Sequence, residues 1–110
     1  MTMPPRKTAR SPELRCPKCA ATHSVASVFD HCDVSWPNQR WLGFECPKCD
    51  HFSHVEVENG RVSIGEIDGA PGPAFFPDNA VAVPGLRYKN AFGGISLTLG
   101  ARRWSVPGKR

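Results

Sequence analysis

The sequence predicts a small all-β fold, and three features of its 110 residues support that prediction. The 11 prolines and 10 glycines favour turns and extended segments over helices. Only 40% of the residues are hydrophobic, so the chain can build a modest core at most. Several short runs alternate polar and apolar residues, which is the pattern of half-buried strands.

The first half of the chain contains short strand-like segments between polar ones. Residues 1–13 hold three prolines and no apolar periodicity, so we expect a flexible basic arm. Residues 24–29, Ser-Val-Ala-Ser-Val-Phe, form a short apolar run with β-branched residues, and we expect a strand there. We also expect a polar loop over 30–38, broken by Pro37, and a second strand over 41–45.

The clearest local signal is a hairpin over residues 52–67. Two alternating runs, 52–57 and 62–67, flank the dipeptide Asn59-Gly60. Asn-Gly between alternating runs is a strong hairpin signal because both central turn residues must accept a positive φ. We therefore expect the apolar residues of each strand to share one face, namely Val55 and Val57 in the first strand and Val62 and Ile64 in the second.

A change in composition near residues 70–77, which contain three prolines, predicts a linker over 68–79. Beyond it, residues 80–83 and 95–99 are expected to form short strands. The apolar positions of 71–110 are few and are separated by turns. We therefore expect this segment to pack on the preceding part of the chain or to extend onto a partner.

Four of the five cysteines occur in two copies of Cys-Pro-Lys-Cys, at residues 16–19 and 46–49. Each copy puts two sulfurs on one tight turn, and two such turns supply the four soft ligands of a tetrahedral zinc site. The fifth, Cys32, leaves an odd count that fits poorly with a closed disulfide framework. Residues 1–15 contain no apolar run, and no stretch of the chain is long and apolar enough to span a membrane. We therefore expect a protein without a signal peptide, in a reducing cytoplasmic environment.

The order of turn, strand, loop, strand, turn and hairpin resembles the zinc ribbon family over residues 14–67. The resemblance implies a small antiparallel sheet beside one structural Zn²⁺ ion, with Cys16, Cys19, Cys46 and Cys49 as its ligands. Family members often have glycine after the second cysteine of each turn, where this chain has Ala20 and Asp50. Because aspartate tolerates a positive φ better than alanine, we expect the first turn to be distorted. The expected organisation is a basic flexible arm over 1–13, the zinc ribbon over 14–67, a Pro/Gly linker over 68–79 and a basic, β-rich C-terminal arm over 80–110.

Other uses of these residues stay open on sequence grounds. Iron in a rubredoxin-like site would use the same four ligands, although we favour zinc. A thioredoxin-like redox role would need one Cys-x-x-Cys at the start of a helix in a βαβ unit. His51 or His54 could replace a cysteine ligand, although we favour the four cysteines. His31 and Cys32 could form a second metal site or a nucleophile, against the simpler interpretation of Cys32 as a small apolar residue.

No known catalytic motif is present, so we expect neither enzymatic activity nor a small-molecule substrate. The net charge of +4 is divided unevenly along the chain. Residues 1–19 contain five basic residues and one acidic residue, 20–84 contain three basic and nine acidic, and 85–110 contain six basic and none acidic. The expected metal module is thus acidic, and both ends are basic. Basic segments attract phosphate or acidic protein surfaces, although they also serve simply to keep a small protein soluble.

These features favour a non-catalytic module that docks through its basic arms within a nucleoprotein or macromolecular assembly, in the cytoplasm or within a virion or nucleoprotein particle. The alternatives are a direct nucleic-acid-binding regulatory protein and a virion or phage structural component. The chain is similar in general form to small zinc-ribbon proteins of bacteriophages and to ribbon subunits of transcription and translation machinery. Aromatic and guanidinium planes could stack on bases, whereas core packing is the interpretation we favour for Trp36 and Trp41. The candidate contact residues are Arg6, Lys7, Arg10, Trp36, Arg40, Trp41, Arg102, Arg103 and Trp104.

Overall fold

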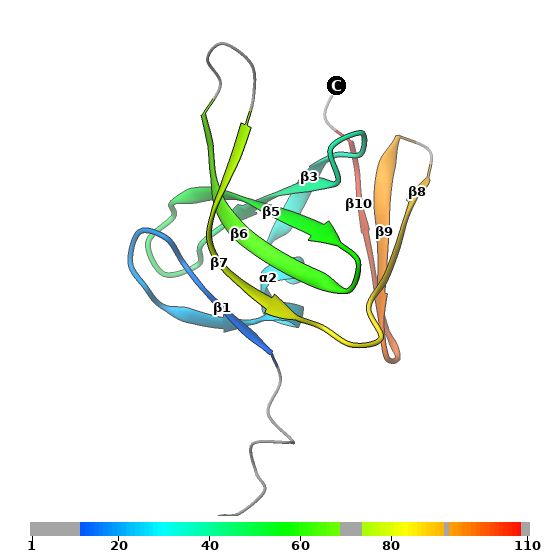
Figure 1. The fold of residues 1–110 in the computed structure, drawn as a ribbon, viewed down its shortest axis with the longest axis horizontal. Helices are drawn as coiled ribbons and strands as arrows, with labels where there is room; N and C mark the ends of the chain where they lie inside the picture. Colours follow the sequence, from blue (N-terminus) through cyan, green and yellow to red (C-terminus); the bar gives the residue numbers. More distant parts are fainter. Residues whose placement is uncertain (1–11, 69–73, 92, 109–110) are drawn as a thin grey trace, which may run out of the picture.

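A computed structural model describes residues 12–68, 74–91 and 93–108 of the chain. Within these residues the strands form three antiparallel sheets, with the orders β3-β4-β5-β6-β7, β10-β9-β8 and β1-β2 (Figure 1). The predicted all-β class is confirmed. The elements are β1 (Glu13–Arg15), β2 (Thr22–Ser24), α2 (Val25–Asp30), β3 (Cys32–Trp36), β4 (Trp41–Glu45), β5 (Phe52–Glu58), β6 (Arg61–Asp68), β7 (Ala74–Ala82), β8 (Arg87–Ala91), β9 (Gly94–Leu99) and β10 (Arg102–Val106).

The predicted hairpin is β5 and β6, and its turn has the geometry that the dipeptide requires. Asn59 has φ of 52° and Gly60 has φ of 74°. The strands pair with Val55 opposite Ile64. The four predicted apolar side chains are all fully buried, at 0% exposure, so they share the inner face of the five-stranded sheet.

The strand expected over 24–29 is wrong, because this segment forms the helix α2. Ser24 caps the helix: its Oγ accepts a hydrogen bond from the N–H of Ser27 at 3.1 Å. Val25, Val28 and Phe29 are buried, and this i, i+3, i+4 spacing is that of one helix face. A short run of β-branched residues therefore forms a helix here because a cap and a core-facing stripe outweigh its strand propensity.

The polar loop expected over 30–38 is also wrong in its middle, where the chain forms β3. This strand pairs with β4, with Trp36 opposite Trp41. The register shifts between Cys32 and Val34, so β3 contains an irregularity of the kind a bulge produces. The turn before β4 ends on Arg40, which has φ of 61°. The predicted strand over 41–45 is confirmed as β4.

The linker expected over 68–79 is wrong from residue 74 onward, because β7 pairs with β6 there. Pro77 is accommodated for two reasons: β7 is an edge strand, and the register shifts between Ile64 and Gly65 opposite it. The register shift requires glycine, since a Cβ on Gly65 would collide with the carbonyl oxygen of Phe76. Residues 69–73 lie outside the described residues. The strand expected over 95–99 is confirmed as β9.

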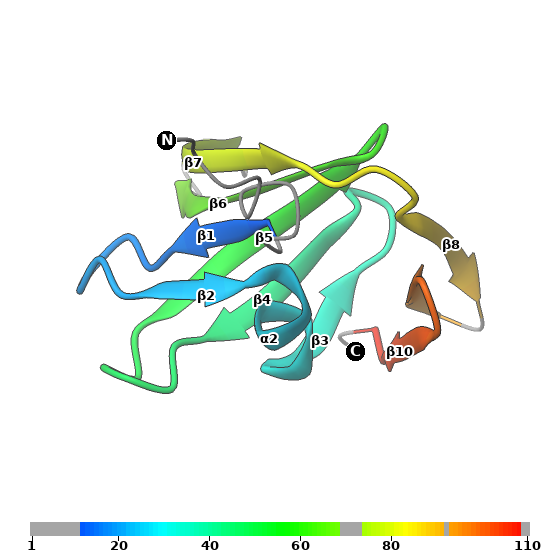
Figure 2. The ribbon, with the colours of Figure 1, turned by 90° about the horizontal axis from the view of Figure 1, so that it is seen from below.

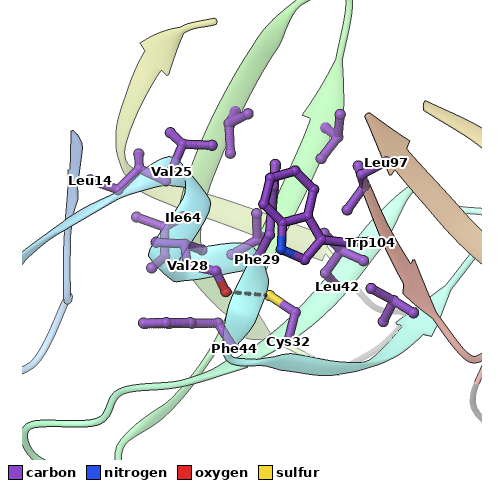
Figure 3. Packing of buried hydrophobic residues seen from close by; sticks show 14 of the residues in the cluster. Leu14, Val25, Val28, Phe29, Cys32, Leu42, Phe44, Ile64, Leu97 and Trp104 are labelled. Carbon is purple, nitrogen blue, oxygen red and sulfur yellow. Dashed lines mark hydrogen bonds between the residues drawn. The ribbon is translucent and has the colours of Figure 1, made fainter. Parts of the chain in front are cut away.

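One hydrophobic core joins the two larger sheets and α2 (Figure 3). Phe29 from the helix meets Trp104 from β10 edge-on, with ring centroids 5.1 Å apart. Leu42 and Ile64 from the five-stranded sheet and Leu97 from β9 are fully buried in the same cluster. The C-terminal segment therefore packs on the preceding part of the chain, which is one of the two arrangements predicted for it.

Ser35 of β3 connects the C-terminal end of the chain to the five-stranded sheet. Its N–H donates to the carbonyl of Pro107 at 2.8 Å. Its hydroxyl lies 3.1 Å from the carbonyl oxygens of both Val106 and Pro107. Ser35 is fully buried, so these contacts satisfy a polar side chain that would otherwise be costly to bury.

Candidate metal centre

The two cysteine turns, residues 16–19 and 46–49, are built alike by backbone hydrogen bonds. In the first turn the N–H of Ala20 donates to the carbonyl of Cys16 at 3.0 Å, and the N–H of Cys16 donates to the carbonyl of Ala21 at 2.9 Å. The bonds at the corresponding positions of the second turn measure 2.8 and 3.0 Å. Both copies of the tetrapeptide thus fold into the same local structure.

The expected distortion of the first turn is wrong. Ala20 has φ of 64° and Asp50 has φ of 65°, so the two residues adopt the same left-handed conformation. That conformation costs roughly 1–2 kcal/mol for a residue with a Cβ. The hydrogen bonds that close each turn determine the backbone at this position, and alanine adopts it as aspartate does.

The four sulfurs of Cys16, Cys19, Cys46 and Cys49 all lie within 4.8 Å of one another. The Sγ atoms of Cys16 and Cys49 are 3.7 Å apart, and those of Cys19 and Cys46 are 3.8 Å apart. Four thiolates at the usual Zn–S length of about 2.3 Å would occupy a tetrahedron with edges of about 3.8 Å. A disulfide would need about 2.05 Å. The donor set and its spacing therefore fit a tetrahedral metal ion, and all four cysteines are free thiols.

Backbone N–H groups point at the sulfur that begins each turn. The N–H groups of Lys18 and Cys19 lie 3.4 and 3.5 Å from the Sγ of Cys16, and that of Lys48 lies 3.4 Å from the Sγ of Cys46. Such contacts stabilise a negative sulfur. The tetrapeptide therefore supplies both the ligands and part of the electrostatic support that thiolates require.

The thiols influence one another's ionisation. Burial raises the pKa of Cys16, but the N–H groups of Cys19 and Lys18 and the thiols of Cys49 and Cys19 together lower it to about 7. The N–H of His51 lowers the pKa of Cys49, but burial and the sulfurs of Cys19, Cys16 and Cys46 outweigh it and raise the pKa to about 12. The Cys16 thiolate therefore forms readily, and its negative charge opposes the ionisation of Cys49. A cation among the sulfurs would remove that opposition.

The cluster lies where two distant loops meet at one end of the molecule (Figures 1 and 2). One loop joins β1 to β2 and the other joins β4 to β5. Cys16 and Cys46 are buried, at 2% and 0% exposure, while Cys19 is exposed and Cys49 is half-buried. The centre thus has one side on the core and one side toward solvent.

His23 is a neighbour of the cluster that the sequence interpretation missed. Its Nε2 lies 3.6 Å from the Sγ of Cys46, and its ring packs edge-on against Phe44 at 5.6 Å. Burial lowers the pKa of His23, which favours the neutral ring. A neutral ring protonated on Nε2 would donate to the Cys46 sulfur. No spacing rule signals this contact, because it arises only when β2 is placed beside the second cysteine turn.

The other histidines considered as ligands lie elsewhere. His51 Nε2 is 2.8 Å from a carboxylate oxygen of Glu66. His54 lies among aromatic rings on the outer face of the five-stranded sheet, 5.0 Å from the ring of Trp36 and 5.2 Å from that of Phe52. Within the described residues, the four cysteines are the group of side chains placed to hold a metal ion.

Cys32 belongs to the hydrophobic core. The residue is 8% exposed, and its thiol donates to the carbonyl of Val28 at 3.1 Å (Figure 3). Burial raises the pKa of the Cys32 thiol far above its ordinary value, so the group stays protonated and unreactive. The ring of the adjacent His31 has its Nδ1 2.9 Å from the carbonyl of Ser27. The interpretation of Cys32 as a small apolar residue is confirmed.

Two of the predicted contact tryptophans are buried and hydrogen-bonded within the protein. Trp41 and Trp104 are each 9% exposed. The Nε1–H of Trp41 donates to Glu56 at 3.2 Å, and that of Trp104 donates to Asp30 at 2.8 Å. The hydrogen bond from Trp104, with the guanidinium of Arg102 also nearby, lowers the pKa of the Asp30 carboxyl. Both indoles are therefore held within the protein. Trp41 is buried as expected, but it packs against His54 and Phe75 and lies outside the hydrophobic core cluster.

The remaining candidate contacts occupy different surroundings. Arg102 stacks over the Trp104 ring at 4.9 Å and pairs with Asp30 at 2.7 Å. Arg40 pairs with Glu58 at 3.3 Å, while Arg103 is exposed on β10. Trp36 is half-buried beside His54. Arg6, Lys7 and Arg10 lie outside the described residues.

Comparison with known proteins adds no relative: no family model, curated protein or solved structure matches the chain. Within the residues that the structure covers, no helix has the length and apolar character needed to cross a membrane.

Proposed function

We propose that the chain is a non-catalytic binding module whose fold depends on one structural Zn²⁺ ion held by Cys16, Cys19, Cys46 and Cys49. The observation that supports this most is the spacing of the four sulfurs, which matches the edges of a zinc–thiolate tetrahedron. Four protein ligands leave no open coordination position for water or a substrate, so the site is structural. All five cysteines are free thiols, which fits a reducing compartment such as the cytoplasm.

The zinc ion, when bound, cross-links the loop between β1 and β2 to the loop between β4 and β5. Structural zinc sites contribute roughly 10–16 kcal/mol of apparent binding free energy at neutral pH. The total stability of a small domain is about 5–15 kcal/mol. Removal of the ion should therefore unfold the part of the chain that contains both turns.

The test measures metal content and secondary structure on the same samples. We expect about one zinc per chain in freshly purified protein, and loss of the strand signal in far-UV circular dichroism on chelation. The variant Cys49→Ser should lose most of its zinc, whereas the matched variant Cys32→Ser, which changes a thiol outside the cluster, should keep it. A chelated protein that stays folded, or a Cys49→Ser variant that keeps full zinc, would contradict the proposal.

We further propose that the module docks within a nucleoprotein or larger macromolecular assembly. The support is the separation of charge: residues 20–84 are acidic and residues 85–110 contain six basic residues and no acidic one. The strands β8, β9 and β10 form a folded sheet, so this part of the chain would dock as a preformed surface and not as a flexible arm. Light scattering on protein recovered from its native source should show a complex much larger than one chain, and a monomer alone would contradict docking.

A further inference from the structure

The outer face of the β8–β9–β10 sheet gathers basic and hydroxyl side chains. Strand alternation turns Leu97 and Trp104 toward the core, so their neighbours in sequence point outward. The pairing then aligns the outward residues in two rows across the sheet. One row is Arg87, Thr98 and Arg103, and the other is Lys89, Ser96 and Ser105; these six residues are called the cationic face.

The cationic face is hollowed. A cavity of about 400 Å³ is lined by Arg87, Lys89 and Arg103, by the hydroxyl residues Ser96 and Thr98, and by Tyr88. All the polar side chains of this lining donate hydrogen bonds, and none is a carboxylate. A hollow that offers three positive charges and several hydroxyl donors is chemically complementary to phosphate oxygens.

The three cations of the cationic face are free to meet a ligand. Across residues 12–68, 74–91 and 93–108, none of Arg87, Lys89 and Arg103 forms an ion pair, whereas Arg15, Arg40 and Arg102 each pair with an acidic residue. Arg87 and Arg103 flank Thr98 from opposite sides, two strand spacings or about 9.6 Å apart at the backbone. An anion bound over Thr98 would therefore lie between two positive charges, one on β8 and one on β10.

We propose that the cationic face binds the phosphodiester backbone of duplex nucleic acid, independently of base sequence. None of the six residues of the cationic face is aromatic, because Tyr88 and Trp104 both lie opposite Leu97 and alternate to the core side of the sheet, so the face offers charge and no ring of its own for base stacking. A contact made to the backbone alone gains most from the polymer with the highest charge density, and duplex DNA has one negative charge per roughly 1.7 Å of axis. This inference rests on the nucleoprotein form of the docking proposed above and names the surface responsible.

The β8–β9–β10 sheet, which carries the cationic face, and the two loops that carry the cysteines lie toward opposite ends of the molecule (Figure 2). Substitution of Arg87 and Arg103, both exposed, should therefore leave the zinc content and the fold unchanged. Arg15 on β1 and Arg61 on β6 provide a matched control, because both are also exposed. Arg15 forms an ion pair with Asp78, and Arg61 lies opposite Glu58 on the neighbouring strand.

The experiment measures fluorescence anisotropy of a labelled, mixed-sequence DNA duplex with the full-length, zinc-loaded chain, from roughly 50 mM to roughly 200 mM salt. Each phosphate contact contributes about 0.9 to the slope of log affinity against log salt concentration. Three contacts therefore predict a loss of wild-type affinity on the order of 40-fold over this range. The double variant Arg87→Gln/Arg103→Gln should flatten the salt slope by about 1.8. The control Arg15→Gln/Arg61→Gln, with the same loss of charge, and the charge-preserving Arg87→Lys/Arg103→Lys should keep the wild-type slope.

Several results would overturn the assignment. If Arg87→Gln/Arg103→Gln binds with the wild-type slope, or the control loses as much as it does, the cationic face is not the site, while nucleic-acid docking through other cations stands. If an acidic peptide of equal charge competes as well as the duplex, the ligand is not nucleic acid. If the zinc-loaded wild type does not bind the duplex at all, both the site and the nucleoprotein form of docking fail, while the zinc content of the same sample still reports on the structural metal.

Discussion

His54, on the outer face of the five-stranded sheet, is a residue through which pH affects the stability of the fold. Its ring lies among those of Trp36, Trp41 and Phe52, at centroid distances of 5.0, 6.2 and 5.2 Å. Burial lowers the pKa of His54 below its ordinary value of 6.5, although Glu66 opposes the shift. The folded state therefore binds a proton less readily than the unfolded state, and acidification favours unfolding.

We expect the stability contributed by His54 to be complete above about pH 6.5, and to fall as pH decreases toward the lowered folded-state pKa. The variant His54→Phe keeps an aromatic ring but removes the titrating group. Its melting temperature should therefore fall less than that of the wild type between about pH 7.5 and about pH 5.5. Acid effects on the cysteine cluster affect both proteins, so the difference between them isolates His54. Equal losses would show that this ring titrates normally.

At the scale of single elements, α2 depends on its cap more than on its propensity. The helix has six residues, two of them β-branched valines, and such a short segment is marginal without tertiary contacts and capping. Replacement of the capping hydroxyl in Ser24→Ala should cost about 1 kcal/mol in the free energy of unfolding, measured by urea denaturation. Ser27→Ala keeps the N–H that donates to the cap, so it serves as the control. A cost equal to that of the control would mean that the cap contributes nothing.

The local signals in the sequence predicted some elements well and others poorly, for physical reasons. The β5–β6 hairpin was predictable because the positive φ values of Asn59 and Gly60 are a local requirement that these two residues meet. The helix α2 was not, since Val25, Val28 and Phe29 suit a buried strand as well as a helix face until the core they meet is known. Similarly, the strand character of β7 depends on pairing with β6 and not on its own proline-containing sequence.

The candidate site likewise has features that the sequence predicted and features that it did not. The four cysteines were predictable because two sulfurs on one turn is a property of the tetrapeptide alone. The contact of His23 with Cys46 and the rows of the cationic face were not, because both depend on which strands lie side by side. For the same reason the run Arg102-Arg103-Trp104 was predicted as one contact, whereas alternation along β10 sends Arg103 to the outer face and Trp104 to the core.

At the scale of the whole molecule, the shared core predicts that the C-terminal sheet and the part of the chain that carries the cysteine cluster unfold together. Leu97 is fully buried between Tyr88 and Trp104 on the neighbouring strands. Leu97→Ala should cost about 2–5 kcal/mol. Tryptophan fluorescence and far-UV circular dichroism should shift together in one transition, because loss of packing in the C-terminal sheet is felt across the core.

The exposed Ser105 provides a control on the same sheet, and Ser105→Ala should change the free energy of unfolding by less than about 0.5 kcal/mol. Two separated transitions in Leu97→Ala would instead show that the C-terminal sheet unfolds independently of the remainder. The chain would then unfold as two units on either side of the expected linker, even though β7 pairs with β6.

X-ray absorption at the zinc edge of freshly purified protein tests the central claim most directly, because it counts the ligands and measures their distances. We expect four sulfurs at about 2.3 Å from the metal and no nitrogen or oxygen ligand. A nitrogen ligand at about 2.0 Å in place of one sulfur would indicate that His23 binds the metal, since its Nε2 is 3.6 Å from the Sγ of Cys46. That result, or a chain without bound metal, would contradict a structural ion held by the four cysteines.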